Sequence, residues 1–377
     1  MKFGRIRDDA GELSAPLLPP EHPSTTHLLN DTDRHGMDHQ QIHRALELFP
    51  PEDPVVRIGL STWGDKSYRG VLYPADAEPG DFLEHYGRIF SAVELSATFY
   101  GMPERARLAA WRDTVPETFR FVPKVSQSLT HRRGLADAQQ GLREFLDHTA
   151  ILGEQRGPLL LQMPPRFAPT PVSYDRLAAA LSILGRRAAV ELRHPAWFTD
   201  RVGDSPEERP DERGAPPAVE LLREYGAALV VTDTLGARRV VHTILTAPVL
   251  VLRFVAAGDA ALDGARIDQW TRQILDWLDR GLREVYLFVH LDDARGALRL
   301  AERFSAGLAS ARAIVRSPRS PDPAELYAPG SEAGMDSNGG ERSGSRGERG
   351  TGSRPGRSDR PGDGSSSGDS HGQLSLF

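Results

Sequence analysis

Cysteine is absent from this sequence of 377 residues, which excludes disulfide bonds and thiolate metal sites. Long apolar runs are also absent, since no stretch approaches the roughly 20 residues that a helix needs to span a bilayer. Residues 1–20 lack the apolar segment of a secretory signal, so we expect a cytoplasmic protein with no membrane partner. The formal net charge is -6, which argues against a broad basic surface that coats nucleic acid but not against a local basic groove.

Eight short apolar runs recur along the middle of the chain, and most are separated by a stretch with helical periodicity. They are VVRIGLST from Val55, AVELSATF from Ala92, RFVPKVS from Arg120, GPLLLQM from Gly157, AAVELRH from Ala188, ALVVTD from Ala228, VLVLRFV from Val249 and EVYLFVH from Glu284. This alternation is typical of a parallel (β/α)8 barrel, which takes about 250 residues. The longest helical stretch places Ile267, Trp270, Ile274 and Leu278 on one stripe, which predicts that it packs on the sheet.

The composition predicts four segments. Residues 1–54 form a mostly disordered extension rich in Pro, His and Asp, and residues 55–310 form the single α/β domain, a (β/α)8 TIM barrel. Residues 311–372 are predicted to be a disordered linker, because from Ser317 to His371 the sequence is mostly Ser, Gly, Pro, Arg and Asp with almost no large apolar side chain. Residues 373–377 are a short apolar peptide that follows this linker.

Almost every run ends in a polar or charged residue, where a barrel places its active site. Strand side chains alternate, and in AAVELRH the apolar Val190 and Leu192 must face the helices, so Glu191 and Arg193 face the interior. The same reasoning gives the candidate catalytic residues Glu94, Lys124, Glu191, Arg193, Asp233, Arg253 and His290. Clustered charges shift each other's pKa values, which suits acid–base chemistry, and the cations favour an anionic ligand. The alternative is a structural network of ion pairs that fills the top of the barrel.

Further polar and aromatic side chains gather near the same strand ends. The candidate substrate-binding residues are Ser61, Trp63, Tyr73, Tyr100, His131, Gln162, His194 and Trp197. The rings would stack on a base or a sugar, although packing of loops onto the barrel explains each ring equally well. A divalent metal is the alternative use of Glu94, Glu191, Asp233, His194, His290 and Asp292. We do not favour it, because Lys124 and two arginines compete for the carboxylates.

Five motifs occur in the order expected of one known family: GLSTWGDKSYRGVLYP from Gly59, VELSATFYGMP from Val93, FRFVPKVSQSLTH from Phe119, LLLQMPPRF from Leu159 and VELRHPAWF from Val190. Together they resemble the domain of unknown function 72 (YecE-like) family, over about residues 55–309. The resemblance implies a TIM barrel and no settled biochemical activity.

The chain departs from this family's pattern at four places. The family commonly has Gly at the position of Thr62 and Asn at that of Ser96. It usually carries an R-x-H-G run on strand seven, where this chain has Arg253 to Ala256, and it often ends strand eight in F-N-N, where this chain has His290, Leu291 and Asp292. An activity that needs the histidine of strand seven would therefore require His290 in its place.

Two functions of different classes remain open from the residues. The first is an enzyme, a hydrolase or lyase, whose phosphate-bearing substrate is a nucleotide or a nucleic-acid end held by Arg193 and Arg253. Glu191 or Glu94 would be the general base, and Lys124 would stabilise developing negative charge. The second is a non-catalytic ligand-binding or scaffolding barrel that its tail recruits to a partner.

The last five residues indicate that partner. Gln373, Leu374, Ser375, Leu376 and Phe377 are similar to the Q-L-[SD]-L-F peptide with which bacterial replication and repair proteins bind the DNA sliding clamp. Leu374, Leu376 and Phe377 offer apolar anchors for a groove, and Gln373 supplies a polar contact. A flexible linker of about 60 residues has a root-mean-square reach of roughly 45 Å, which would hold the barrel near DNA. The alternative is a segment that folds back onto the barrel.

Overall fold

The computed structural model describes residues 18–21, 25, 54–198, 217–309 and 314–316. The strands of these residues all pair in parallel. They are β1 (Val55–Leu60), β2 (Ala92–Leu95), β3 (Arg120–Pro123), β4 (Leu159–Gln162), β5 (Ala188–Glu191), β6 (Ala228–Leu229), β7 (Val231–Asp233), β8 (Val249–Val255), β9 (Glu284–His290) and β10 (Ile314–Arg316). Among the described helices, none is long and apolar enough to cross a membrane.

The strands form two hydrogen-bonded sheets, in the orders β3-β2-β1-β9-β8-β7 and β4-β5-β6. An isolated bridge between Lys124 and Leu160 joins β3 to β4. The strands β6 and β7 are two pieces of one extended segment, which is interrupted at Val230, where the N–H donates to Val190 O at 2.8 Å. Each strand thus follows its chain neighbour and β9 returns to β1, which is the order of a (β/α)8 barrel with an interrupted ladder at two junctions.

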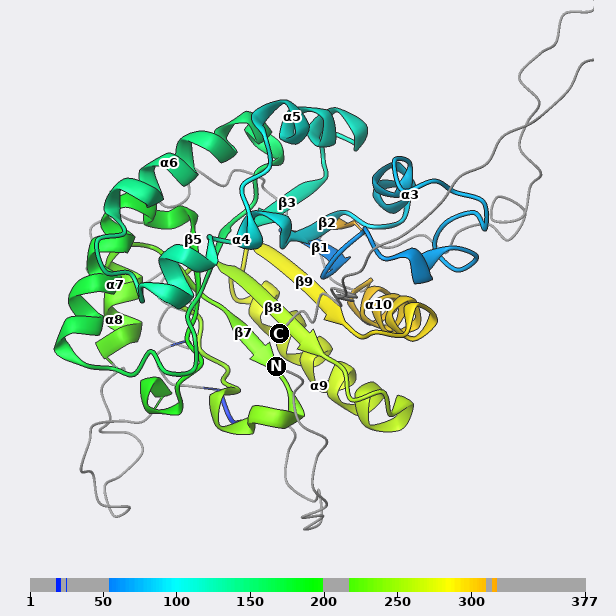
Figure 1. Ribbon diagram of the computed structural model, residues 1–377. Coiled ribbons are helices and arrows are strands. Elements are labelled where there is room, and N and C mark those ends of the chain that lie inside the picture. Colours follow the sequence, from blue (N-terminus) through cyan, green and yellow to red (C-terminus); the bar gives the residue numbers. More distant parts are fainter. Residues whose placement is uncertain (1–17, 22–24, 26–53, 199–216, 310–313, 317–377) are drawn as a thin grey trace, which may run out of the picture. The chain divides into compact units, whose positions relative to one another are not determined.

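Helices alternate with the strands, as the sequence periodicity predicts. The α-helices are α3 (Phe82–Ile89), α4 (Ala97–Tyr100), α5 (Arg105–Thr114), α6 (Gln139–Thr149), α7 (Pro171–Leu184), α8 (Pro217–Glu224), α9 (Ala260–Asp279) and α10 (Ala294–Leu308). Short 3-10 or π segments are η1 (Lys66–Tyr68), η2 (Ser128–Arg132), η3 (Ala150–Gln155), η4 (Gly185–Arg187), η5 (Pro195–Phe198) and η7 (Leu235–Val240). Figure 1 shows α6, α7 and α8 following one another, with α9 and α10 packed together. Asp259 and Asp293 cap α9 and α10 by accepting backbone N–H groups, which fixes where these helices begin.

Alternating strand residues divide the core into an outer and an inner part. The outer part joins strand residues such as Ile58 and Leu252 to the helices, and it contains the stripe of α9 that the sequence predicts. The inner part consists mainly of small and branched side chains with two rings: Ala92, Val122, Leu160, Ala189, Ala228, Val230, Ala247, Val249, Val251, Tyr286 and Phe288. The interior below the strand ends is therefore packed mainly with apolar side chains, as in a TIM barrel.

Two segments differ from the sequence interpretation. The run from Ala92 ends as a strand at Leu95 and continues as α4. Residues 314–316, assigned above to a linker, form β10, which pairs with Val55–Arg57 while β2 pairs with the other half of β1. Residues 18–21 and Thr25 pack on the barrel, where Thr25 Oγ1 accepts from Leu245 N–H at 2.8 Å. The remainder of residues 1–53 and residues 317–377, with the peptide from Gln373 to Phe377, lie outside the described residues.

Candidate active site at the strand ends

The inward-facing residues at the carboxyl ends of the strands form one buried polar group. All but Arg193 follow an inner-core residue by two positions, as Glu94 follows Ala92 and Glu191 follows Ala189, and Arg193 follows Glu191 by two. We call Glu94, Lys124, Gln162, Glu191, Arg193, Arg253 and His290 the mouth cluster. All except Arg193 are at most 6% exposed. The sequence prediction that these strand ends share one site is consistent with their mutual contacts.

Arg253 lies at the centre of the mouth cluster and joins its two carboxylates. Its Nε and Nη2 donate to Glu94 Oε2 and Oε1 at 2.9 and 3.1 Å. Its Nη1 donates to Glu191 Oε2 at 2.9 Å, and Gln162 Nε2 donates to the same oxygen at 2.7 Å. The guanidinium fork is therefore occupied by protein carboxylates, so Arg253 orients Glu94 and Glu191 rather than presenting a vacant fork to a ligand.

Both carboxylates stay ionised at neutral pH. Burial alone would raise the pKa of Glu94, but Arg253, His290 and Lys124 outweigh it and hold the pKa well below its usual range. Burial also raises the pKa of Glu191, but the charges of Arg253 and Arg193 outweigh it, so that the pKa lies below its ordinary value. Glu191 Oε1 has no hydrogen-bond partner among the described residues. This oxygen is the one carboxylate position of the pair that could accept a proton from a ligand without breaking a bond to Arg253.

Lys124 occupies the apolar side of the mouth cluster. Its Nζ lies 4.4 Å from the centre of the Phe99 ring and 3.9 Å from Glu94 Oε1. Burial is the main cause that lowers the pKa of Lys124 to about 8, and the nearby Arg253 and Arg193 lower it further against the attraction of Glu94 and Glu191. Thr98 Oγ1 donates to the backbone oxygen of Lys124 at 2.8 Å, which fixes the end of β3 against β2. Lys124 can therefore exist as an ammonium or as a free amine near neutral pH.

Two histidines of the site are neutral at pH 7. His290 Nε2 lies 3.3 Å from Glu94 Oε2, yet burial and Arg253 lower the pKa of His290. His131, on η2, is half-buried, and burial together with Lys124 and Arg193 lowers its pKa to about 4. His131 Nδ1 lies 2.9 Å from Thr130 Oγ1, and its ring meets Phe99 edge to face at 5.0 Å. His131 and Lys124 therefore both contact the ring of Phe99, and a role of His131 in substrate binding stays a prediction.

The rim of the mouth cluster combines a cation with an exposed ring. Arg193 Nε lies 3.6 Å from Glu191 Oε1, and 18% of the Arg193 side chain is exposed. Tyr100 is 45% exposed, and burial and the charge of Glu94 raise its pKa. Ser61 follows β1 and is half-buried. His194 Nδ1 accepts the Ala196 N–H at 3.2 Å, so one of its ring nitrogens caps η5.

The placement of Asp233 in the barrel interior is wrong. Asp233 is fully buried, but its Oδ2 accepts from Trp270 Nε1 at 2.8 Å and from Arg266 Nε at 3.2 Å, and both partners belong to α9. Thr232 is the inward residue, because it pairs in register with Arg253. ALVVTD is apolar on both faces, so alternation could not decide which side of this strand faces the helices.

Three of the predicted aromatic contacts are packing contacts. Tyr73 is fully buried, and its hydroxyl donates to Trp63 O at 2.8 Å. Trp63 meets Trp111 edge to face at 5.1 Å in the outer core. Trp197 is 2% exposed, stacks on a neighbouring ring and donates its Nε1–H to Phe167 O. These rings hold loops against the helices, and of the predicted rings Tyr100 is the exposed one.

The carboxylates and histidines of the site do not gather around a common point. In the described part of the chain, no group of three or more His, Asp or Glu side chains is arranged to hold a metal ion. Glu94 and Glu191 form ion pairs with Arg253, and Asp233 forms an ion pair with Arg266 of α9. In this geometry the carboxylates pair with arginine and lysine side chains and do not surround a common metal position.

One residue of the site was missed in the sequence. Thr232 Oγ1 is buried and has no hydrogen-bond partner within the described residues. Alternation could not have identified it, because both faces of ALVVTD are apolar and the inward position of Val230 follows only from the structure. Phe99, the last residue of the apolar run from Ala92, supplies the ring beneath Lys124 and lies on α4 rather than on a strand.

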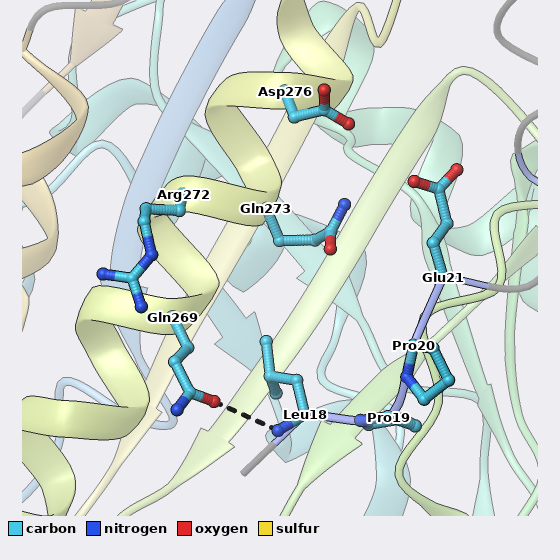
Figure 2. A pocket seen from close by; sticks show the side chains of 8 residues that line it. All are labelled: Leu18, Pro19, Pro20, Glu21, Gln269, Arg272, Gln273 and Asp276. Atoms are coloured by element: carbon cyan, nitrogen blue, oxygen red, sulfur yellow. Dashed lines mark hydrogen bonds between the residues drawn. The ribbon is translucent and has the colours of Figure 1, made fainter. Parts of the chain in front are cut away.

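A recess of about 450 Å³ lies away from the mouth cluster, between residues 18–21 and α9. Figure 2 shows Leu18 beside Gln269, whose Oε1 accepts the Leu18 N–H at 3.1 Å. Glu21 binds Arg280 through two contacts at 2.7 and 2.9 Å. These contacts attach the segment to α9, and the recess lacks the buried charges that distinguish the mouth cluster.

Comparison with known proteins identifies similar chains. The sequence model described as "Protein of unknown function DUF72" matches residues 57–325. The UPF0759 protein YecE of Escherichia coli O157:H7 is 26% identical over 251 residues, which cover 63% of this chain and 87% of that protein. YunF of Bacillus subtilis (strain 168) is 29% identical over 152 residues, which cover 38% of this chain and 53% of that protein.

Solved structures of the same description share the fold. The DUF72 proteins of Enterococcus faecalis V583 and Thermotoga maritima MSB8 each give a TM-score of 0.52, at 22% and 23% identity. Each alignment covers 68% of this chain, together with 96% and 100% of the respective structure. This likeness supports the barrel and carries no information on substrate.

Proposed function

The chain belongs to the DUF72 family, whose function is unknown, and we propose that the mouth cluster is an enzyme site for an anionic substrate. The observation that carries the proposal is a cluster of three cations and two carboxylates at the carboxyl ends of the strands. With both histidines neutral, the cations outnumber the carboxylates. A bound anion would balance the remaining positive charge in a buried setting, where an uncompensated charge is costly.

The contacts suggest a separate role for each charged residue. Arg193 and protonated Lys124 would hold the anionic group, because Arg253 is already engaged by Glu94 and Glu191. Glu191 would be the general base through Oε1. Tyr100, exposed at the rim, would stack on a base or sugar of the substrate. The reaction would be a hydrolysis or a lyase reaction on a phosphate-bearing compound, with a nucleotide or nucleic-acid end as the first candidates.

Binding can be tested by calorimetry with nucleoside monophosphates, 5′-phosphorylated oligonucleotides and phosphosugars. We expect at least one class to bind, and R193Q to weaken that binding by about tenfold or more, since a charge-assisted contact contributes about 1.5–3 kcal/mol. R88Q is the matched control, because Arg88 is an exposed arginine of α3 that pairs with Glu84. Equal weakening by both variants would show that only the overall charge matters.

Turnover separates the enzyme from a non-catalytic barrel. E191Q keeps the size of the side chain and removes the base, so it should retain binding and lose turnover by about 100-fold or more. Binding without any turnover in the unmodified chain would favour the ligand-binding or scaffolding alternative.

We further propose that the peptide from Gln373 to Phe377 tethers the barrel to the DNA sliding clamp. The support is the match of all five residues to a clamp-binding peptide, after a stretch with almost no large apolar side chain. Titration of purified clamp with the full chain should give binding that the F377A variant lowers by about tenfold or more. S375A, at a position with no anchor role, should bind like the full chain. Equal affinity of all three proteins would reject the tether.

A further inference from the structure

Lysine is rare in this chain, and one of its few lysines is buried. Lys2, Lys66 and Lys124 are its only lysines, while every other basic side chain among 46 Lys and Arg residues is arginine. Lys66 is exposed, and Lys124 is 6% exposed. An arginine would supply a permanent positive charge at position 124. A lysine differs chemically in that its amine can lose a proton and become a nucleophile.

The surroundings of Lys124 favour that loss. No hydrogen bond to its Nζ is found in the described part of the chain, and the aromatic face of Phe99 lies beneath it. Glu94 and Glu191 attract the ammonium, whereas Arg253 and Arg193 repel it. Burial tips this balance and brings the pKa to about 8, so roughly a tenth of the side chains carry a free amine at pH 7. Desolvation together with neighbouring cations is a recognised way to activate a lysine nucleophile.

We propose that Lys124 is a nucleophile that forms an imine with a carbonyl compound bearing an acid group. The proposal rests on the anion binding proposed above, because Arg193 would hold the acid group while the carbonyl carbon meets Nζ. The substrate class is a 2-oxo acid or a phosphorylated aldehyde or ketone. This class narrows the proposed reaction to lyase chemistry.

The step balances without an oxidant or a reductant. The lone pair of the neutral amine attacks the carbonyl carbon, and the carbon–oxygen π electrons move to oxygen, which takes up one of the two nitrogen protons through water. The neutral carbinolamine then loses its hydroxyl together with the remaining nitrogen proton as water, so that amine and carbonyl give imine and one water. When protonated, the imine carries the charge that the ammonium carried.

The existing ion pairs suit that protonated imine. Glu94 Oε1, 3.9 Å from Nζ, would stabilise its positive charge, and the two bonds from Arg253 hold Glu94 in place. Glu191 Oε1 is within 3.6 Å of Arg193 Nε, so the second carboxylate lies beside the proposed acid contact. A base at this place could remove a proton from the carbon next to the imine.

The test is reductive trapping on the full chain. Pyruvate, glyoxylate or dihydroxyacetone phosphate is added at pH 7.5 with sodium cyanoborohydride, which converts an imine into a stable secondary amine. Intact mass and peptide mapping then locate the adduct. Lys66 and Lys2 are internal controls in the same molecule, and K66R and K124R are matched variants that keep the charge.

We expect about tenfold or more adduct on Lys124 than on Lys66 with at least one compound, loss of that adduct in K124R, and no change in K66R. Equal trapping on Lys66 and Lys124 with all three compounds would overturn the inference. Lactate and glycerol 3-phosphate are controls that carry the acid group but no aldehyde or ketone. If they bind and no compound is trapped on Lys124, the imine is rejected while anion binding stands. If neither they nor the carbonyl compounds bind, the imine proposal fails, and the calorimetry with nucleotides and oligonucleotides decides whether anion binding stands.

Discussion

Two groups of buried charges lie on opposite sides of the barrel wall, and they differ in how completely their atoms are paired. One is the mouth cluster. The other, which we call the α9 network, contains Asp233, Arg238, Asp263, Arg266 and Trp270. Asp263 accepts the N–H groups of residues 257 and 258 and pairs with Arg266 Nη1 at 2.8 Å, and Arg266 Nη2 donates to two backbone oxygens. Both oxygens of Asp233 are also bound.

The mouth cluster and the adjoining Thr232 contain polar atoms without a hydrogen-bond partner. Glu191 Oε1 and Thr232 Oγ1 make no hydrogen bond within the described residues, and no hydrogen bond to Lys124 Nζ is found there. Buried polar atoms are normally paired, so the proposed ligand would supply partners to these atoms, whereas the α9 network is explained by the attachment of α9 to the barrel. The comparison shows that burial of charge does not by itself mark a functional site.

The largest effect should come from the centre of the mouth cluster. R253M leaves two buried carboxylates without their shared cation, and we expect the free energy of unfolding to fall by about 3–5 kcal/mol. Urea unfolding measures it, with R88M on the exposed face of α3 as the control. A loss below about 1 kcal/mol would mean that Glu94 and Glu191 are not held as described.

A smaller loss of stability should follow a change in the α9 network. D233N keeps the shape but weakens the bonds to Arg266, so the free energy of unfolding should fall by about 1–3 kcal/mol. Anion binding in the mouth should remain unchanged, because Asp233 faces α9. R193Q should do the reverse, with binding weakened and stability nearly preserved. A loss of anion binding in D233N would remove the distinction between the two groups.

The smallest effect concerns the histidine beside Lys124. His131 should remain neutral from pH 8 down to about pH 5, because its pKa is lowered to about 4. Burial is the main cause and the charge of Lys124 the next, so K124M should raise this pKa without restoring the ordinary value near 6.5. Nuclear magnetic resonance of the imidazole follows the titration. A pKa of His131 near the ordinary 6.5 would contradict its placement near the cations of the mouth cluster.

Alternation in the sequence predicts most of the site because most strands have one apolar face. Glu94 and Glu191 each lie between apolar neighbours that must face the helices, so their direction follows from the pattern. Asp233 could not be placed, since both faces of ALVVTD are apolar until Thr232. Tyr73 and Trp197 show a second limit. An aromatic residue near a strand end either packs between a loop and the helices or faces the mouth. Contacts that arise only when the chain folds decide between the two.

The pH dependence of sulfate binding tests the central claim, that Lys124 takes part in holding an anion in the mouth. Sulfate keeps its charge between pH 6.5 and 9.5, so a change in affinity reports on the protein. Lys124 is protonated below its pKa of about 8, and its charge is lost above it. Equilibrium dialysis with labelled sulfate should therefore show affinity falling by about tenfold through this range. K124R should bind with constant affinity. A fall of the same size in K124R, or none in the unmodified chain, would contradict the account.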